Sequence, residues 1–129
     1  PAIQLDFAPT ALAAAGVTAP ADARFDGVNL LPFLSGQNTG RPHDALYWRF
    51  GQQMAVRQGD FKLVRYDAAA DGGKGGVTGP RLYNLATDIG EATDLMAREP
   101  ERAKSLQALW DRWNAGNVPP LWGGGKKAP

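Results

Sequence analysis

Alternating apolar and polar positions in the middle of the chain predict β-strands. Residues 54–57 and 61–66 alternate with the period of two that a strand with one buried face shows, and residues 45–50 form an aromatic-rich run. A fourth short strand is expected at 81–85, after a glycine-rich loop. The Gly-Asp pair at 59–60 is a tight-turn signal between the second and third strands. The pattern therefore predicts a small four-stranded antiparallel sheet.

Further along the chain the apolar spacing changes to that of a helix. Apolar residues recur three or four positions apart and so share one stripe: Ala103, Leu106, Leu109, Trp110 and Trp113. Pro100 suits the first helical position, and the glutamates on either side of it suit the positive end of the helix dipole. The spacing predicts a C-terminal helix over 100–114 that packs against one face of the sheet.

The N-terminal half of the chain is expected to be irregular, with short helical segments. Residues 3–16 fit a helix in which Asp6 caps the start and Gly16 ends it. The expected buried face of this helix consists of Phe7, Ala11, Ala14 and Ala15. A further helical turn is expected in the leucine-rich stretch 28–34. The predicted fold class is therefore α+β.

Length and charge predict the number of domains and exclude some classes of partner. With 129 residues and a formal net charge of +1, one compact domain is expected over 1–117, followed by a flexible tail at 118–129. The near balance of charges predicts no nucleic-acid partner and no attraction to an anionic membrane. No apolar run reaches the roughly 20 residues that a membrane-spanning helix needs. Because position 1 is Pro rather than Met, the start is interpreted as a cut end or a tag remnant.

The chain contains no cysteine and only one histidine. Disulfides, thiolate metal sites and a cysteine nucleophile are therefore excluded within these residues. A single histidine cannot build a zinc site alone, since such sites take three or four protein ligands.

Five short patterns occur in order between about residue 3 and residue 113. They are Asp-Phe-Ala-Pro-Thr-Ala-Leu at 6–12, Asp-Gly-Val-Asn-Leu-Leu-Pro-Phe-Leu-Ser-Gly at 26–36, Leu-Tyr-Trp-Arg-Phe at 46–50, Ala-Val-Arg-Gln-Gly-Asp-Phe-Lys-Leu-Val at 55–64 and Arg-Leu-Tyr-Asn-Leu-Ala-Thr-Asp-Ile-Gly-Glu-Ala-Thr-Asp-Leu at 81–95. Together they resemble the C-terminal subdomain of the formylglycine-dependent sulfatases, the arylsulfatase family of the alkaline phosphatase superfamily. Ile89, Asp94 and Arg49 depart from the family's usual Pro, Asn and acidic residue, whereas Gly90 still permits an unusual φ in the turn.

The resemblance implies that catalysis belongs to a larger domain that precedes this region. Sulfatases hydrolyse sulfate esters with a formylglycine and a bound calcium ion, and none of the motifs that carry these groups matches a position here. The resemblance thus implies no catalytic residue, metal or cofactor in this chain, which is expected to be inert alone and to support the catalytic domain. It also implies a sulfated small molecule or glycan as substrate, and a periplasmic or secreted parent protein. Separated from its catalytic domain, the chain is expected to form a homodimer through exposed apolar surface.

Three residues are candidates for contacting a substrate at the rim of the pocket. His43 would touch the sugar or aryl part, or would instead be a loop histidine bonded to Asp44. Arg49 would attract an anion through its forked guanidinium, or would instead be a solvent-facing strand residue. Trp48 would offer a stacking platform, or would instead pack in the structure. Each pair of alternatives stays open at the level of sequence.

Two further cations and a loop are interpreted as structural. Arg57 and Lys62 are expected to pair with Asp60 or Asp88. The glycine-rich loop at 72–79 lacks the Gly-Lys-(Ser/Thr) ending of a phosphate-binding loop.

Two other functions compete with the sulfatase interpretation. A free-standing carbohydrate-binding module could use the four Trp and three Tyr residues of the chain. A related hydrolase of phosphate or phosphonate esters would share the same C-terminal patterns, and only its nucleophile would distinguish it.

Overall fold

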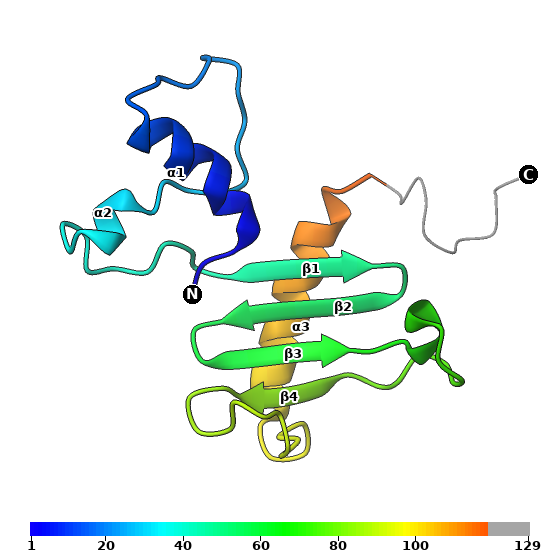
Figure 1. The fold of residues 1–129 in the computed structure, drawn as a ribbon. Coiled ribbons are helices and arrows are strands. Elements are labelled where there is room, and N and C mark those ends of the chain that lie inside the picture. The colour runs from blue at the N-terminus through cyan, green and yellow to red at the C-terminus, as the bar shows by residue number, and fades with distance from the viewer. Residues whose placement is uncertain (119–129) are drawn as a thin grey trace, which may run out of the picture. The chain divides into compact units, whose positions relative to one another are not determined.

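The computed structural model describes residues 1–118, apart from the side chains of Ala70 and Asp71. The chain divides into two compact units, Pro1–Asp44 and a second unit from Ala45 onward, and each is described by itself. Figure 1 identifies the elements, and their content confirms the predicted α+β class. The predicted tail at 118–129 lies outside the described residues except for Val118, and a single domain over 1–117 stays a prediction.

The N-terminal unit contains a 3₁₀ turn, η1 (Gln4–Asp6), and two helices, α1 (Phe7–Ala14) and α2 (Leu31–Leu34), that contact each other. Thr10 ties α1 to the segment before α2, because its hydroxyl accepts the Leu30 N–H at 2.9 Å. Gly16, with a φ of 69°, follows the end of α1 as predicted. The helical turn expected in 28–34 is confirmed as α2.

Two details expected of the first helix are wrong. Asp6 itself has helical backbone angles as part of η1, and its side chain makes no capping hydrogen bond to α1. The expected buried face is exposed, with Phe7 at 70%. Thr10, Leu12 and Ala13 are half-buried instead. An alanine-rich helix carries little apolar contrast between its sides, so its sequence does not specify which face is covered.

The second unit is built on an antiparallel sheet with strand order β1-β2-β3-β4. The strands are β1 (Leu46–Phe50), β2 (Gln53–Gln58), β3 (Phe61–Arg65) and β4 (Arg81–Asn84), as predicted to within one or two residues. Neighbours in sequence are neighbours in the sheet, because β1, β2 and β3 are joined by two-residue turns. The longer connection between β3 and β4 includes a 3₁₀ turn, η2 (Ala68–Asp71).

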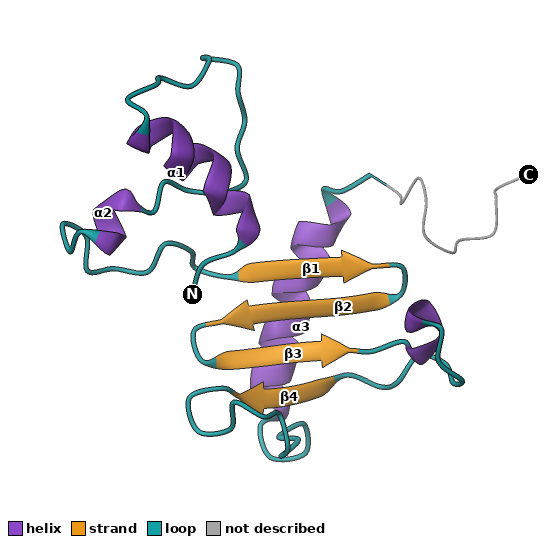
Figure 2. Ribbon diagram, viewed as in Figure 1, coloured by secondary structure: helices purple, strands orange, loops and turns teal. Residues whose placement is uncertain are grey.

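Helix α3 (Pro100–Ala115) packs on one face of this sheet (Figure 2). The predicted stripe is confirmed: Ala103, Leu106 and Trp110 are buried against the sheet, and Leu109 and Trp113 are half-buried beside them. The strands contribute the other half of the core with Met54, Val56, Leu63 and Leu82. Because side chains alternate along a strand, the strand residues next in sequence to each of these four face away from α3. No helix within residues 1–118 is long and apolar enough to cross a membrane.

Candidate functional site

The face of the sheet opposite α3 presents a row of cross-strand pairs. Leu63 and Leu82 point toward α3, so their neighbours on β3 and β4 point to the open face. The register pairs Lys62 with Tyr83 and Val64 with Arg81, and residues paired in this way share a face. The open face of β3 and β4 therefore gathers two cations, an aliphatic residue and a tyrosine.

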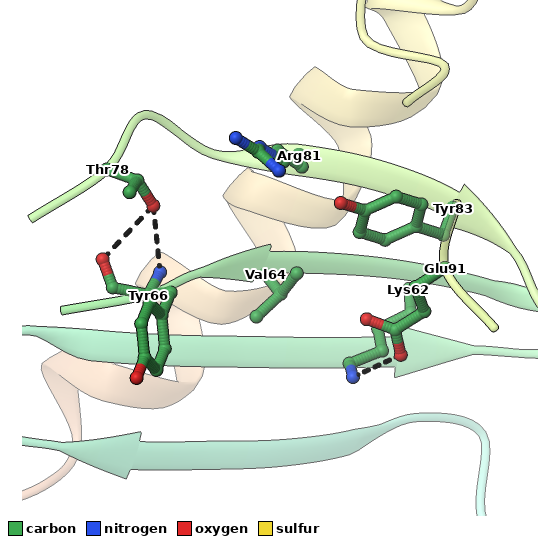
Figure 3. Close-up of a pocket in the computed structure, with 7 residues that line it drawn as sticks. All are labelled: Lys62, Val64, Tyr66, Thr78, Arg81, Tyr83 and Glu91. Carbon is green, nitrogen blue, oxygen red and sulfur yellow. Dashed lines mark hydrogen bonds and ion pairs between the residues drawn. The ribbon is translucent and has the colours of Figure 1, made fainter. Parts of the chain in front are cut away.

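The row continues past the ends of the strands through Tyr66 and Thr78. The Thr78 N–H donates to the Tyr66 carbonyl oxygen at 2.8 Å, and the Thr78 hydroxyl lies 3.1 Å from the same oxygen. With Glu91, these residues line a pocket of about 440 Å³, shown in Figure 3. The pocket thus combines charged, hydroxyl and aromatic groups on one surface.

An ion pair closes one end of the pocket. Lys62 Nζ lies 2.6 Å from Glu91 Oε1, and the two side chains are 26% and 30% exposed. The expected pairing of Lys62 with Asp60 or Asp88 is therefore wrong. Glu91, with a φ of 56°, takes the left-handed backbone angle of its turn, and Gly90 does not. This unusual angle accompanies the placement of a carboxylate beside Lys62.

The other acidic residues of this turn have structural roles. The Asp88 carboxylate accepts the N–H groups of Ala92 and Thr93 at 3.0 and 2.8 Å, and these two bonds hold the pKa of Asp88 below its ordinary value. The Asp94 carboxylate accepts the N–H of Leu82 at 3.1 Å and so covers a donor of β4. Glu91 is thus the acid of the turn that lines the pocket.

Arg81 and Tyr83 supply donors that have no partner among residues 1–118. The exposed Arg81 side chain makes no hydrogen bond or ion pair with any residue in the described part of the chain. Tyr83 is only 5% exposed, yet its hydroxyl has no hydrogen-bond partner among residues 1–118. This hydroxyl is not sealed from solvent, since no fully buried side-chain polar atom there lacks a partner. Figure 3 shows it directed toward the middle of the pocket, beside Arg81.

His43, the first residue predicted to contact substrate, is engaged within the N-terminal unit. Its Nε2 lies 2.9 Å from both carboxylate oxygens of Asp6, rather than being bonded to Asp44 as the alternative suggested. Burial raises the pKa of Asp6, but hydrogen bonds from the Ile3 N–H, His43 and the Val28 N–H outweigh it and leave that pKa lowered. His43 and Asp6 therefore hold this unit together, and a substrate contact of His43 stays a prediction.

Arg49 and Trp48 point to opposite faces of β1. The Arg49 guanidinium lies on the α3 face, where it donates to Asn114 Oδ1 at 2.6 Å and to the Val118 carbonyl oxygen at 2.7 Å. Trp48 pairs with Ala55 on the other face and is 37% exposed. These two predicted residues therefore do not converge on one site, and their contact with a substrate stays a prediction.

Relatives of known family resemble most of this chain. No protein-family model matches the sequence. The chain is 30% identical over 114 residues to Arylsulfatase G from Rattus norvegicus, an alignment that covers 79% of this chain and 22% of the relative. It is also 50% identical over 44 residues to the uncharacterized sulfatase YdeN of Escherichia coli K12, covering 34% of this chain and 8% of that protein. The chain belongs to the sulfatase family.

Solved structures place this sulfatase-family chain in the same fold. The structure of Ps i-CgsB matches with a TM-score of 0.74 and 23% identity over 95% of this chain and 26% of that one. BT4656, solved with its substrate D-glucosamine-2-N,6-O-disulfate, matches with a TM-score of 0.61 and 24% identity over 85% of this chain and 23% of that one. The phosphonate monoester hydrolase of Agrobacterium radiobacter matches with a TM-score of 0.51 and 24% identity over 85% and 23%. Such likenesses show the fold alone.

The sulfatase-family chain spans about a fifth of the length of the arylsulfatases that it matches. It corresponds to the C-terminal part of these longer proteins, within the alkaline phosphatase superfamily, as the five sequence patterns predict.

The sequence of this sulfatase-family chain does not by itself single out the pocket residues Tyr66, Thr78, Arg81 and Tyr83. The register between β3 and β4 would identify them, but the long loop between these strands does not determine that register. Alternation alone places Arg81 and Tyr83 on one face, but it does not indicate which residues of β3 lie beside them.

Proposed function

We propose that this chain is the C-terminal part of a hydrolase that cleaves sulfate esters, and that it is inert without a catalytic domain. The alignment with Arylsulfatase G over 79% of the chain is the observation that carries this proposal. In the whole protein, the chain would support the catalytic domain and contribute to the rim of the substrate pocket. Trp48, with its exposed ring, is the predicted site residue most available for such a contact.

The cofactors of the family do not fit the residues of this chain. Formylglycine forms from cysteine in most sulfatases, and the chain has none. Calcium takes six to eight oxygen ligands, and residues 1–118 contain no group of three acidic or histidine side chains that could hold a metal. We therefore assign both groups to the catalytic domain, and no step of the reaction is derived for the present residues.

The substrate proposed for the whole protein is a sulfated small molecule or glycan, and the proposed location is the periplasm or the cell exterior. The support for the substrate is the sulfated glucosamine bound by the structural neighbour BT4656. The support for the location is the family resemblance.

The test compares this chain with the protein that includes the catalytic domain. Both are incubated with 4-nitrophenyl sulfate, and release of nitrophenol is followed. We expect release by the longer protein and none above background by the chain alone. Enzymatic release by the purified chain would overturn the assignment of catalysis to another domain.

A hydrolase of phosphate or phosphonate esters is the second candidate. The match to a phosphonate monoester hydrolase, with a TM-score of 0.51, favours it. The same assay of the longer protein with a phosphonate monoester separates the two candidates. A higher kcat/KM for the phosphonate than for the sulfate would make phosphonate cleavage the main activity.

A carbohydrate-binding module is the third candidate. It is favoured by the exposed ring of Trp48, which would stack on a sugar. Calorimetry of the chain with a sulfated glycan, compared with Trp48→Ala, tests it. Binding that is unchanged by Trp48→Ala would remove this ring from the proposal.

A further inference from the structure

We propose that the pocket between β3 and β4 binds the sulfate ester of a saccharide, with Arg81 and Tyr83 as donors to the anion. The choice of an anionic ester follows from the pocket itself. The choice of a saccharide as its carrier rests on the proposed function.

Two donors converge on the same space, and neither has an acceptor in the described part of the chain. The guanidinium of Arg81 has no partner within the described residues, although its planar donors suit an oxyanion. Tyr83 is 95% buried by its neighbours and leaves only its hydroxyl directed into the pocket, as Figure 3 shows. A buried tyrosine usually finds a hydrogen-bond partner; the Tyr83 hydroxyl reaches solvent and has no partner among residues 1–118, so a ligand atom can complete the bond.

The charge of the pocket matches an anion that carries a single charge. Lys62 and Arg81 contribute two positive charges, and Glu91 contributes one negative charge, so the lining has a net charge of +1. Since Glu91 is paired with Lys62, the excess positive charge lies at Arg81. A sulfate ester carries one negative charge, whereas a phosphate monoester carries about 1.5 to 2 near neutral pH. The net charge of +1 fully compensates a sulfate ester, whereas the second negative charge of a phosphate would stay uncompensated beside the Glu91 carboxylate.

The remaining lining suits the body of a sugar. The volume of about 440 Å³ falls within the range of small-molecule sites, roughly 300 to 1,000 Å³. Val64 provides an apolar surface in the middle of the pocket, and the half-exposed side chain of Tyr66 lies at the end away from Lys62, as Figure 3 shows. The Thr78 hydroxyl already donates to the Tyr66 carbonyl oxygen and accepts the Tyr66 N–H, and it keeps one lone pair for a sugar O–H. Aromatic rings and hydroxyl groups are the partners that C–H faces and O–H groups of a pyranose use.

The test is an NMR titration of the ¹⁵N-labelled full chain with glucose 6-sulfate. Glucose 6-phosphate, glucose and sodium sulfate are titrated in parallel at constant ionic strength. We expect shifts confined to the amides of β3, β4 and the turn of Glu91, with Kd of about a millimolar for a small, open site. Glucose 6-phosphate and sodium sulfate should bind more weakly, and glucose alone should not bind.

Two substitutions and two matched controls identify the donors. Arg81→Gln should weaken binding about tenfold, because it removes a charged hydrogen bond, and Tyr83→Phe should weaken it about threefold to fivefold. Arg98→Gln and Tyr47→Phe remove an arginine and a tyrosine hydroxyl outside the pocket and should leave the Kd unchanged. The unliganded spectrum of each variant shows whether it is folded.

Several results would overturn the proposal. Equal shifts with glucose would show that the pocket does not recognise the anion. Tighter binding of glucose 6-phosphate would show that the pocket prefers a phosphate ester to a sulfate ester. Binding unaffected by Arg81→Gln, or no shifts at β3 and β4, would refute the site. The nitrophenyl sulfate assay is independent of these outcomes, so a failed pocket and a failed sulfatase assignment can be told apart.

Discussion

At the scale of single residues, the N-terminal unit depends on the buried carboxylate of Asp6. This side chain is fully buried and accepts the N–H groups of Ile3 and Val28, each at 2.9 Å. Asp6→Ala would leave both donors unsatisfied, and we expect it to destabilise this unit by about 1–3 kcal/mol. Hydrogen exchange of the Val28 amide measures the loss, and the exposed Asp22→Ala is the control. Unchanged protection of Val28 would contradict this role.

The same carboxylate should make the N-terminal unit sensitive to acid. Burial raises the pKa of Asp6, but the bonds from Ile3, His43 and Val28 lower it below the ordinary 3.8. Because the folded pKa lies below the unfolded one, the stabilisation is complete above pH 3.8 and is lost as the pH falls through the folded pKa. An NMR titration of the Asp6 carboxyl group should have its midpoint below 3.8, and a midpoint above that value would refute this expectation.

Gly27 is required by a close approach within the same unit. A Cβ atom at this position would lie 2.1 Å from the carbonyl oxygen of Leu5, which is backbone and cannot rotate away. We expect Gly27→Ala to destabilise the N-terminal unit by about 1–3 kcal/mol through this clash. Gly76→Ala is the matched control, because no atom of residues 1–118 lies within 4 Å of its added Cβ. Exchange of the Val28 amide serves again as the measurement, and equal protection in both variants would argue against the clash.

At the scale of elements, the contact between α3 and the sheet holds the second unit together. Leu106 is 2% exposed in the core of this contact. We expect Leu106→Ala to lower the free energy of unfolding by about 2–5 kcal/mol, because it removes buried methyl groups and leaves a cavity. Tryptophan fluorescence in urea reports this unit, since every Trp of the chain lies after residue 44. Ile89→Ala, at a side chain 81% exposed, should change stability by less than about 0.5 kcal/mol. Similar losses in the two variants would show that the contact is not the main source of stability.

At the scale of the whole molecule, exposed apolar side chains predict self-association of the chain in isolation. Phe7 is 70% exposed, Leu34 75% and Phe50 57%. Surface of this kind favours burial against a partner, and a second copy is the available partner when the chain is alone. We expect light scattering to show a mass that rises toward a dimer with concentration. A constant monomer mass at all concentrations would exclude this behaviour.

Local patterns determined the elements and the family of this protein. The alternation in β3 and the stripe of α3 are short-range consequences of having one buried face, so the sequence displays them directly. The turn chemistry at 59–60 likewise determined the pairing of β2 with β3. The ordered patterns from residue 6 to residue 95 predicted the sulfatase family, which the relatives confirm.

Tertiary structure decided which side chains meet. Asp6 and His43 are 37 residues apart, and Lys62 and Glu91 are 29 apart, so no periodicity relates either pair. Arg81 and Tyr83 share a surface with Lys62 and Val64 only because β4 returns beside β3 in one register after a long loop. Local preferences act over a few residues, whereas these contacts arise when distant segments bury their apolar faces together, and the polar residues on the open side follow that packing.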